Sequence, residues 1–175
     1  MPPFDTIATR ARKDGLSYCV GLPLPAAEAD LLQQPGLNPA GEPGVSPGQG
    51  VLTLWGTGLT ASVLFQVQAP FKAGQAFVVC QGDDGNDSWF DLAGCLLPAN
   101  TPVGGSALFL LPLGPFGNVA VLQQTRQPGT PPPANFANPS PMPGRFRFVG
   151  QAPGSGSGSG AAVQVSIWYR PTPLR

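Results

Sequence analysis

The chain has 175 residues, of which 24 are glycine and 23 are proline, and its nine basic side chains balance nine acidic ones. A charged fraction of 10% and no net charge argue against a nucleic-acid partner, which requires a basic surface, and the absence of histidine excludes the usual Ser/His/Asp, Cys/His and zinc–histidine sites. Since 42% of the residues are hydrophobic, we expect a folded domain rather than a disordered chain.

Residues 1–50 are predicted to form an N-terminal segment and an extended arm outside the folded domain. They open without the basic stretch and apolar core of a signal peptide, so we expect synthesis in the cytosol. Six prolines between residues 22 and 50 alternate with glycines, which disfavours a β-ladder. A short helix over 25–34 is the one regular element expected there, because Pro25 suits a first helical turn and Pro35 ends it.

From residue 51 onward the apolar residues recur with a period of two, which is typical of strands that bury one face. In 60–68, for example, Val63 and Phe65 alternate with more polar neighbours. Eight short strands with almost no helix between them predict an all-β domain over 51–175, an antiparallel β-sandwich with jelly-roll-like or Greek-key connections. The predicted strands are 51–55, 60–68, 75–81, 88–93, 106–112, 118–125, 145–150 and 161–170.

Two segments interrupt this pattern. Residues 128–144 hold seven prolines in 17 residues, which favours an extended excursion whose backbone groups are free to meet a neighbour. Residues 154–160 alternate glycine and serine between two well-patterned strands, and we interpret them as a flexible hairpin tip.

An oxygen-rich turn contains Asp83, Asp84 and Asp87. Its spacing departs from that of an EF-hand and lacks the distal glutamate, so we interpret it as a plain acidic turn, with calcium binding as the alternative. We otherwise expect no metal, no cofactor and no catalytic residue.

The three cysteines are Cys19, Cys80 and Cys95, and no pair has the spacing of a zinc knuckle or a redox motif. Their apolar neighbours favour buried, reduced thiols. A bridge between Cys80 and Cys95 is the alternative.

The arms are expected to become ordered on a partner, because their composition prevents them from forming a sheet of their own. Trp168 joins these contacts, since it lies opposite the apolar face of its own strand. The predicted partner-binding residues are Leu22, Leu24, Leu31, Leu32 and Leu37 in the first arm, Phe136 and Met142 in the second, and Trp168.

The strand, acidic turn and aromatic strand over 77–92, together with the closing strands over 146–169, resemble small β-sandwich proteins of tailed bacteriophage virions. The resemblance implies a non-enzymatic structural role, such as capsid decoration, in the virion. The implied partners are the major capsid protein or other virion proteins, with a homo-oligomer expected and neither nucleic acid nor membrane as a partner. A carbohydrate- or receptor-binding module of a phage tail or fibre is the alternative.

Overall fold

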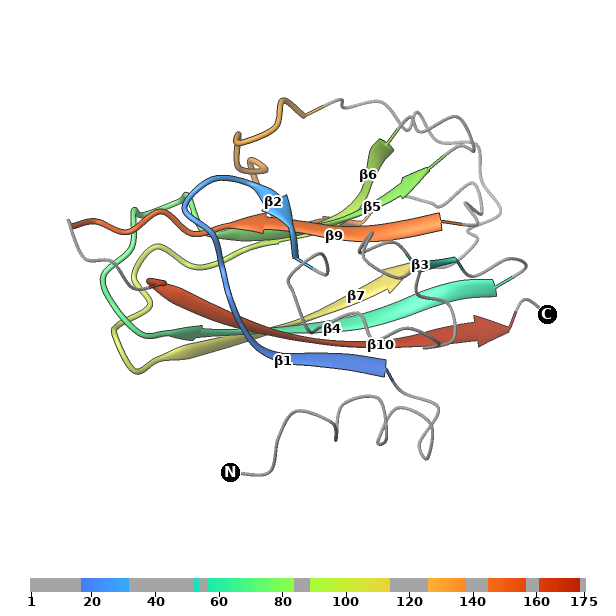
Figure 1. Ribbon diagram of the computed structural model, residues 1–175, viewed down its shortest axis with the longest axis horizontal. Coiled ribbons are helices and arrows are strands. Elements are labelled where there is room, and N and C mark those ends of the chain that lie inside the picture. Colours follow the sequence, from blue (N-terminus) through green and yellow to red (C-terminus); the bar gives the residue numbers. More distant parts are fainter. Residues whose placement is uncertain are drawn as a thin grey trace.

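Two antiparallel β-sheets pack face to face (Figure 1). The computed structural model describes residues 17–31, 52–53, 57–83, 89–113, 126–137, 145–156 and 161–173, and these contain no α-helix. One sheet has four strands in the order β1-β10-β4-β7, and the other has six, in the order β2-β9-β5-β6-β8 with β3 also paired to β9. The strands are β1 (Ser17–Pro23), β2 (Ala29–Asp30), β3 (Leu52–Thr53), β4 (Thr57–Val67), β5 (Phe77–Asp83), β6 (Trp89–Leu96), β7 (Ser106–Leu113), β8 (Phe136–Ala137), β9 (Arg145–Gln151) and β10 (Val163–Pro173). The predicted all-β sandwich is confirmed.

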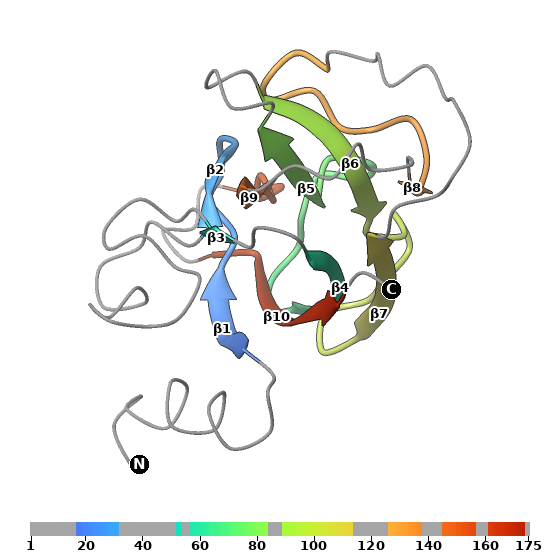
Figure 2. The same cartoon turned by 90° about the vertical axis from the view of Figure 1, so that its right-hand side faces the viewer.

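The order of strand pairing is that of a jelly roll. If β3 and β8 are set aside, the first strand pairs with the last (β1 with β10), the second with the seventh (β2 with β9), the third with the sixth (β4 with β7) and the fourth with the fifth (β5 with β6). This nesting is one long antiparallel hairpin rolled up into two sheets. Figure 2 shows the roll end-on.

The core lies between the sheets and follows the predicted alternation. Val63 and Phe65 on β4 are fully buried, and Val165 and Ile167 of β10 lie directly opposite them in the ladder. From the other sheet, β9 contributes Phe148 to the same cluster. The period of two in the sequence therefore identified the faces that the two sheets turn toward each other.

The described part of the predicted first arm belongs to the sandwich. β1 pairs with β10 and β2 pairs with β9, so a β-ladder does run through this segment. Leu22, Leu24 and Leu31 are at most 2% exposed and lie in the core cluster. The predictions that these leucines bind a partner and that 25–34 is a helix are wrong over the described residues, because distant strands supply the hydrogen bonds that the local sequence does not.

A bulge in β1 explains how a proline- and glycine-containing segment enters the sheet. The register with β10 shifts between Cys19 and Leu22, which brings Leu22 opposite Val165 and turns it toward the core. Pro23, at the end of this edge strand, is exposed, and Leu24 continues the ladder through its N–H, which donates to Val163 O at 2.9 Å. Proline is tolerated in such an edge position.

The strand predicted at 118–125 lies outside the described residues, whereas β1, β2 and β8 were not predicted. The prediction that 154–160 is the tip of a hairpin is wrong. The two strands of a hairpin pair with each other, whereas the flanking strands β9 and β10 lie in different sheets. Gly154 instead forms a bridge with Phe71.

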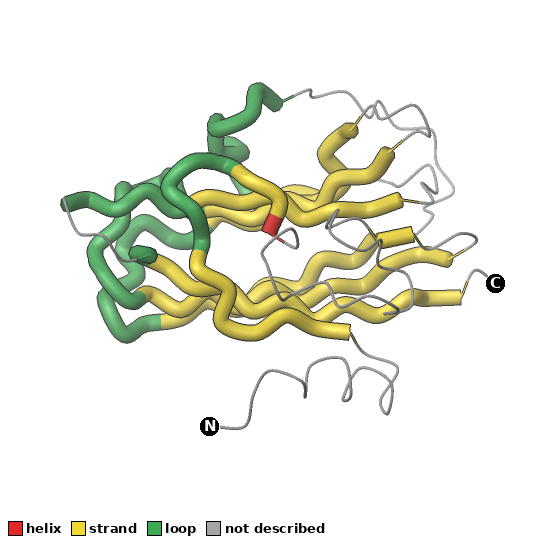
Figure 3. Tube along the Cα trace, in the orientation of Figure 1, coloured by secondary structure: helices red, strands yellow, loops and turns green. Residues whose placement is uncertain are grey.

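The described loops gather at one end of the sandwich, where they are drawn in green in Figure 3.

We expect Leu24→Ala to lower the free energy of unfolding by about 2–4 kcal/mol, because it leaves a cavity in a core that cannot fully close. The matched control is Val103→Ala, since Val103 lies in a loop and is 57% exposed, and this change is expected to stay within about 0.5 kcal/mol. Urea unfolding curves of the two variants give the comparison. Equal, small effects would mean that Leu24 lies outside the core.

Candidate interaction surface

Residues 126–137, which we call the strap, cover the outer face of the six-stranded sheet. Phe136 packs on a small apolar cluster of Phe77, Val79 and Val149 that faces away from the main core. In Figure 2 the strap, in orange, passes outside β5 and β6. The described part of the predicted free excursion is thus packed on the chain itself, and the prediction that Phe136 binds a partner is corrected accordingly.

Glycine on β6 makes room for the strap. A Cβ atom built on Gly94 would lie 2.5 Å from Cε1 of Phe136 and 3.1 Å from Cγ2 of Val79. The strap is also hydrogen-bonded to the sheet: Leu96 N–H donates to Oδ1 of Asn135 at 2.8 Å, and Nε2 of Gln151 donates to Gly129 O at 3.1 Å. Side chains and backbone groups of the sheet therefore supply hydrogen-bond partners for the proline-rich strap.

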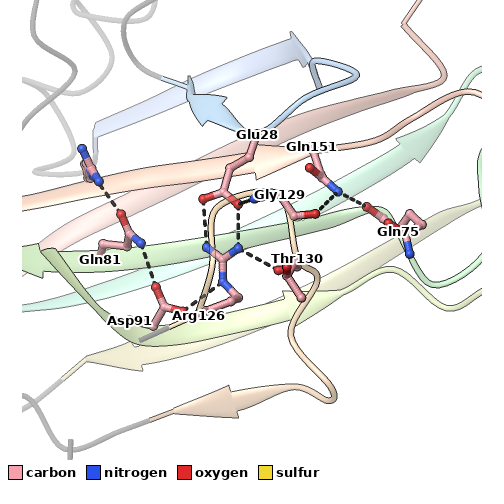
Figure 4. A network of polar contacts seen from close by, with 9 residues as sticks. Glu28, Gln75, Gln81, Asp91, Arg126, Gly129, Thr130 and Gln151 are labelled. Carbon is pink, nitrogen blue, oxygen red and sulfur yellow. Dashed lines mark hydrogen bonds and ion pairs between the residues drawn. The ribbon is translucent and has the colours of Figure 1, made fainter. Parts of the chain in front are cut away.

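The strap is anchored at its first residue by an ion-paired cluster, which we call the clasp: Arg126, Glu28 and Asp91 (Figure 4). Nη1 and Nη2 of Arg126 lie 2.6 and 2.9 Å from the two carboxylate oxygens of Glu28, and Nε lies 3.0 Å from Oδ2 of Asp91. Nη1 also donates to Thr130 O, and Glu28 accepts a hydrogen bond from the Gly129 N–H. The three charged side chains are only 7–8% exposed.

A hydrogen-bonded chain extends the clasp along the sheet. Nε2 of Gln81 donates to Asp91 at 2.7 Å, and Oε1 of Gln81 accepts from Nε of Arg147 at 2.8 Å. The Arg147 guanidinium lies 4.2 Å from the ring centroid of Trp89. A bulge between β5 and β6 places Gln81 opposite Asp91 and turns both outward, while the consecutive residues Leu92 and Ala93 both enter the core.

The clasp favours the ionised forms of its groups. Burial by itself raises the pKa of Glu28, but the hydrogen bonds from Arg126 and Gly129 and the positive charges of Arg126 and Arg147 outweigh it, and the pKa lies below its ordinary value of 4.5. Burial lowers the pKa of Arg126, and its hydrogen bonds and charge pairing with Glu28 and Asp91 raise it above its ordinary value. Because the charges and hydrogen-bonding groups of the clasp satisfy one another, the clasp fastens the strap to the sheet.

The outer face of the four-stranded sheet presents a different surface. Three consecutive rows of residues lie on the outer side of β10, β4 and β7, and we call them the open face; by register, the row Arg170, Thr60 and Pro112 continues them on the same side. Leu108 and Leu110 on the edge strand β7 are 67% and 66% exposed, whereas Leu64 and Trp168 beside them are half-buried. None of the nine residues is charged, but the adjoining row contains Arg170, and Ser166 is only 2% exposed in the single chain. The rows are Trp168, Ser62 and Leu110; Ser166, Leu64 and Leu108; and Gln164, Gln66 and Ser106.

Two exposed leucines that alternate on one strand distinguish the open face from an ordinary sheet surface, where polar residues face the water. The run Ser106–Leu113 is apolar on both of its faces, which is typical of a strand that is covered on both sides. In the sequence this run predicts a strand, but it does not show which face of the strand stays exposed.

Trp168 faces outward on β10, as predicted. Leu32, Leu37, Met142, Asp84 and Asp87 lie outside the described residues, and Asp83 is the last residue of β5. The residues of the clasp were not predicted, because Arg126 is 98 residues from Glu28 and 35 from Asp91 in the sequence.

Cys80 and Cys95 are buried free thiols, so the alternative of a bridge between them is wrong. Burial raises the pKa of both, to about 12 for Cys95, which makes them unreactive. In the described part of the chain, no group of three or more His, Cys, Asp or Glu side chains is placed to hold a metal ion. The same residues include no helix with the length and apolarity needed to cross a membrane.

No protein-family model matches the chain, and no curated protein matches it in sequence. The resemblance to phage virion proteins therefore stays a prediction, and the jelly-roll fold is established by the strand pairing alone.

We expect Glu28→Gln to reduce stability at pH 7 by about 2–4 kcal/mol, because it removes one of the two carboxylates that neutralise the desolvated guanidinium of Arg126. Since the folded-state pKa of Glu28 is lowered, its contribution is complete above about pH 4.5 and is lost as the pH falls through the folded value. The stability difference between the wild-type chain and this variant should thus stay constant from about pH 6 to about pH 4.5 and shrink as the pH falls further toward pH 3. Urea unfolding across this range measures it.

Lys72→Gln, a change of one exposed charge on a loop, is the control for that series. Its small stability difference from the wild-type chain is expected to stay nearly constant over the same range. A Glu28→Gln difference that is equally constant would contradict the assignment of the clasp.

Gly94→Ala is expected to destabilise the wild-type chain by about 1–3 kcal/mol, because the new methyl group collides with the ring of Phe136. In a Phe136→Ala background the same change should cost little or be favourable, since the ring is gone and alanine restricts the unfolded chain more than glycine does. Unfolding midpoints of the four proteins form a double-mutant cycle. Additive effects would show that the strap does not rest on Gly94.

Proposed function

We propose that this protein is a non-enzymatic structural protein of a virion, which decorates or stabilises a bacteriophage capsid through contacts with the major capsid protein or other virion proteins. The open face carries the proposal. Neighbouring exposed leucines on the outer face of a sheet are typical of a surface that contacts another protein.

The fold and the clasp support the same function. Jelly rolls are common among viral capsid domains, but also among lectins and cupins, so the fold alone does not decide the function. The charged groups of Arg126, Glu28 and Asp91 are engaged in holding the strap, which suits a rigid structural part. The resemblance over 77–92 and 146–169 agrees with this assignment.

A second candidate is a carbohydrate- or receptor-binding module of a phage tail or fibre. The position of Trp168 favours it, because a partly exposed tryptophan on a sheet face is a suitable stacking surface for a sugar ring. The leucines beside it favour a protein partner instead.

The proposal predicts that the chain is present in particles of the phage that encodes it. We expect quantitative mass spectrometry of gradient-purified particles to find it in a fixed ratio to the major capsid protein, in the head fraction when heads and tails are separated. A non-virion protein made in the same cells serves as the control for carry-over. Presence only in the tail fraction would favour the second candidate, and loss during purification, as for the carry-over control, would exclude both.

A further inference from the structure

The strap lies outside the main core of the sandwich. No residue of 126–137 belongs to the core cluster between the sheets, and eight of these twelve residues are exposed. In the strap, β8 joins β6 through two residue pairs, whereas β5 joins β6 and β9 through seven pairs each. The sandwich therefore has its own core and its own ladders, and these do not require the strap.

The strap is attached to the sheet at its two ends. At its beginning, Arg126 lies in the clasp and the Gly129 N–H donates to Glu28 at 2.7 Å (Figure 4). At its end, Phe136 packs on the small apolar cluster of the outer face, and the strap accepts a hydrogen bond from β6. The Arg126 guanidinium also lies 4.9 Å from the ring centroid of Phe77, a member of that cluster. The two attachments thus meet at one ring, which couples them.

We propose that the strap is a detachable cover: when the carboxylates of the clasp lose their charge in acid, residues 126–137 leave the sheet as one unit while the sandwich stays folded. Detachment uncovers the apolar cluster of Phe77, Val79 and Val149, which the strap covers in the closed chain. The inference goes beyond the proposed function and does not depend on it.

The charges on this face make protonation of carboxylates the trigger. The guanidiniums keep their positive charge at every pH that a folded protein meets, whereas the carboxylates that compensate them do not. Protonation weakens the hydrogen bonds that Arg126 makes to charged oxygens and leaves its charge without compensation. The charged residues that contact the clasp, or lie on this side of the sheet by register, are Arg126, Arg145, Arg147, Glu28, Asp30, Asp83 and Asp91 within the described part of the chain.

The sign of the pH dependence follows from Glu28. Burial raises its pKa, but Arg126 and Gly129 hold it below its ordinary value of 4.5. A carboxylate whose pKa is lower in the closed state favours closure fully above about pH 4.5, and this contribution is lost as the pH falls through the lower, closed-state value. The strap is therefore expected to stay closed near neutral pH and to open in acid.

Hydrogen exchange followed by NMR separates the strap from the sandwich through four amides of the full chain. The Gly129 N–H donates to the clasp and the Leu96 N–H donates to the far end of the strap. The N–H groups of Leu97, the next residue along, and of Leu24 donate to carbonyls of the sandwich at 2.8 and 2.9 Å, and they are the matched controls. From about pH 6 to about pH 3 we expect the protection factors of the two strap amides to fall about tenfold or more relative to those of the controls, since each charge-assisted hydrogen bond that is lost corresponds to about that factor.

Two variants test whether the strap leaves as one unit. Glu28→Gln weakens the clasp, and at pH 7 it should lower the protection of Leu96 at the opposite end about tenfold or more. Phe136→Ala weakens that opposite end and should in turn lower the protection of Gly129. Because Glu28→Gln has no carboxylate to protonate at this position, its further fall in acid should be smaller than that of the wild-type chain. Lys72→Gln, an exposed change in a loop, is the control and should leave all four amides unchanged.

Three results would overturn the proposal. An equal loss of protection at all four amides would show that the strap leaves only when the whole chain unfolds. Strap amides that keep their protection down to about pH 3 would show that the clasp does not respond to acid. An effect of each variant that is confined to its own end would show that the two ends open separately. None of these results changes whether the chain is found in particles, so the proposed function stands or fails by its own test.

Discussion

The register between β4 and β10 determines both the inside and the outside of the four-stranded sheet. Eleven residue pairs join these two strands, from Val163 opposite Val67 to Pro173 opposite Thr57. A slip of one residue would turn the buried side chains of either strand outward, because neighbouring residues of a strand face opposite sides. The buried valines and phenylalanine and the set of residues on the open face are therefore two consequences of a single pairing.

The two outer faces of the sandwich differ in how far their apolar side chains are covered. On the six-stranded sheet, apolar side chains such as Phe77 and Val149 are covered by the strap, and Phe136 lies above Gly94. On the four-stranded sheet, Leu108 and Leu110 remain exposed in the single chain. The strap thus completes the outer face of one sheet, whereas the exposed leucines lie on the edge strand of the other sheet. This difference is why we assign protein contact to the open face and a structural role to the clasp.

The clasp joins three segments that are far apart in the sequence. Glu28 precedes β2, Asp91 lies on β6 and Arg126 begins the strap, so a single guanidinium holds a loop, a strand and a covering segment together. A buried ion pair adds little net stability compared with a well-packed apolar contact, but the loss of one member is costly. Its contribution is thus best described as fixing the position of the strap.

The local pattern determined the class of fold and most of the strands. The alternation in 60–68, 145–150 and 161–170 correctly predicted the buried faces and the outward direction of Trp168, because the backbone of each strand sets the direction of its own side chains. The segment around Leu22 and Leu24 was misassigned, since its partner β10 lies near the other end of the chain and local proline content does not reveal it. The clasp and the covering of Phe136 also depend on such distant contacts. The exposure of Leu108 and Leu110 was decided only in the tertiary structure, because the sequence of one strand shows that both its faces are apolar but does not show whether another layer covers them.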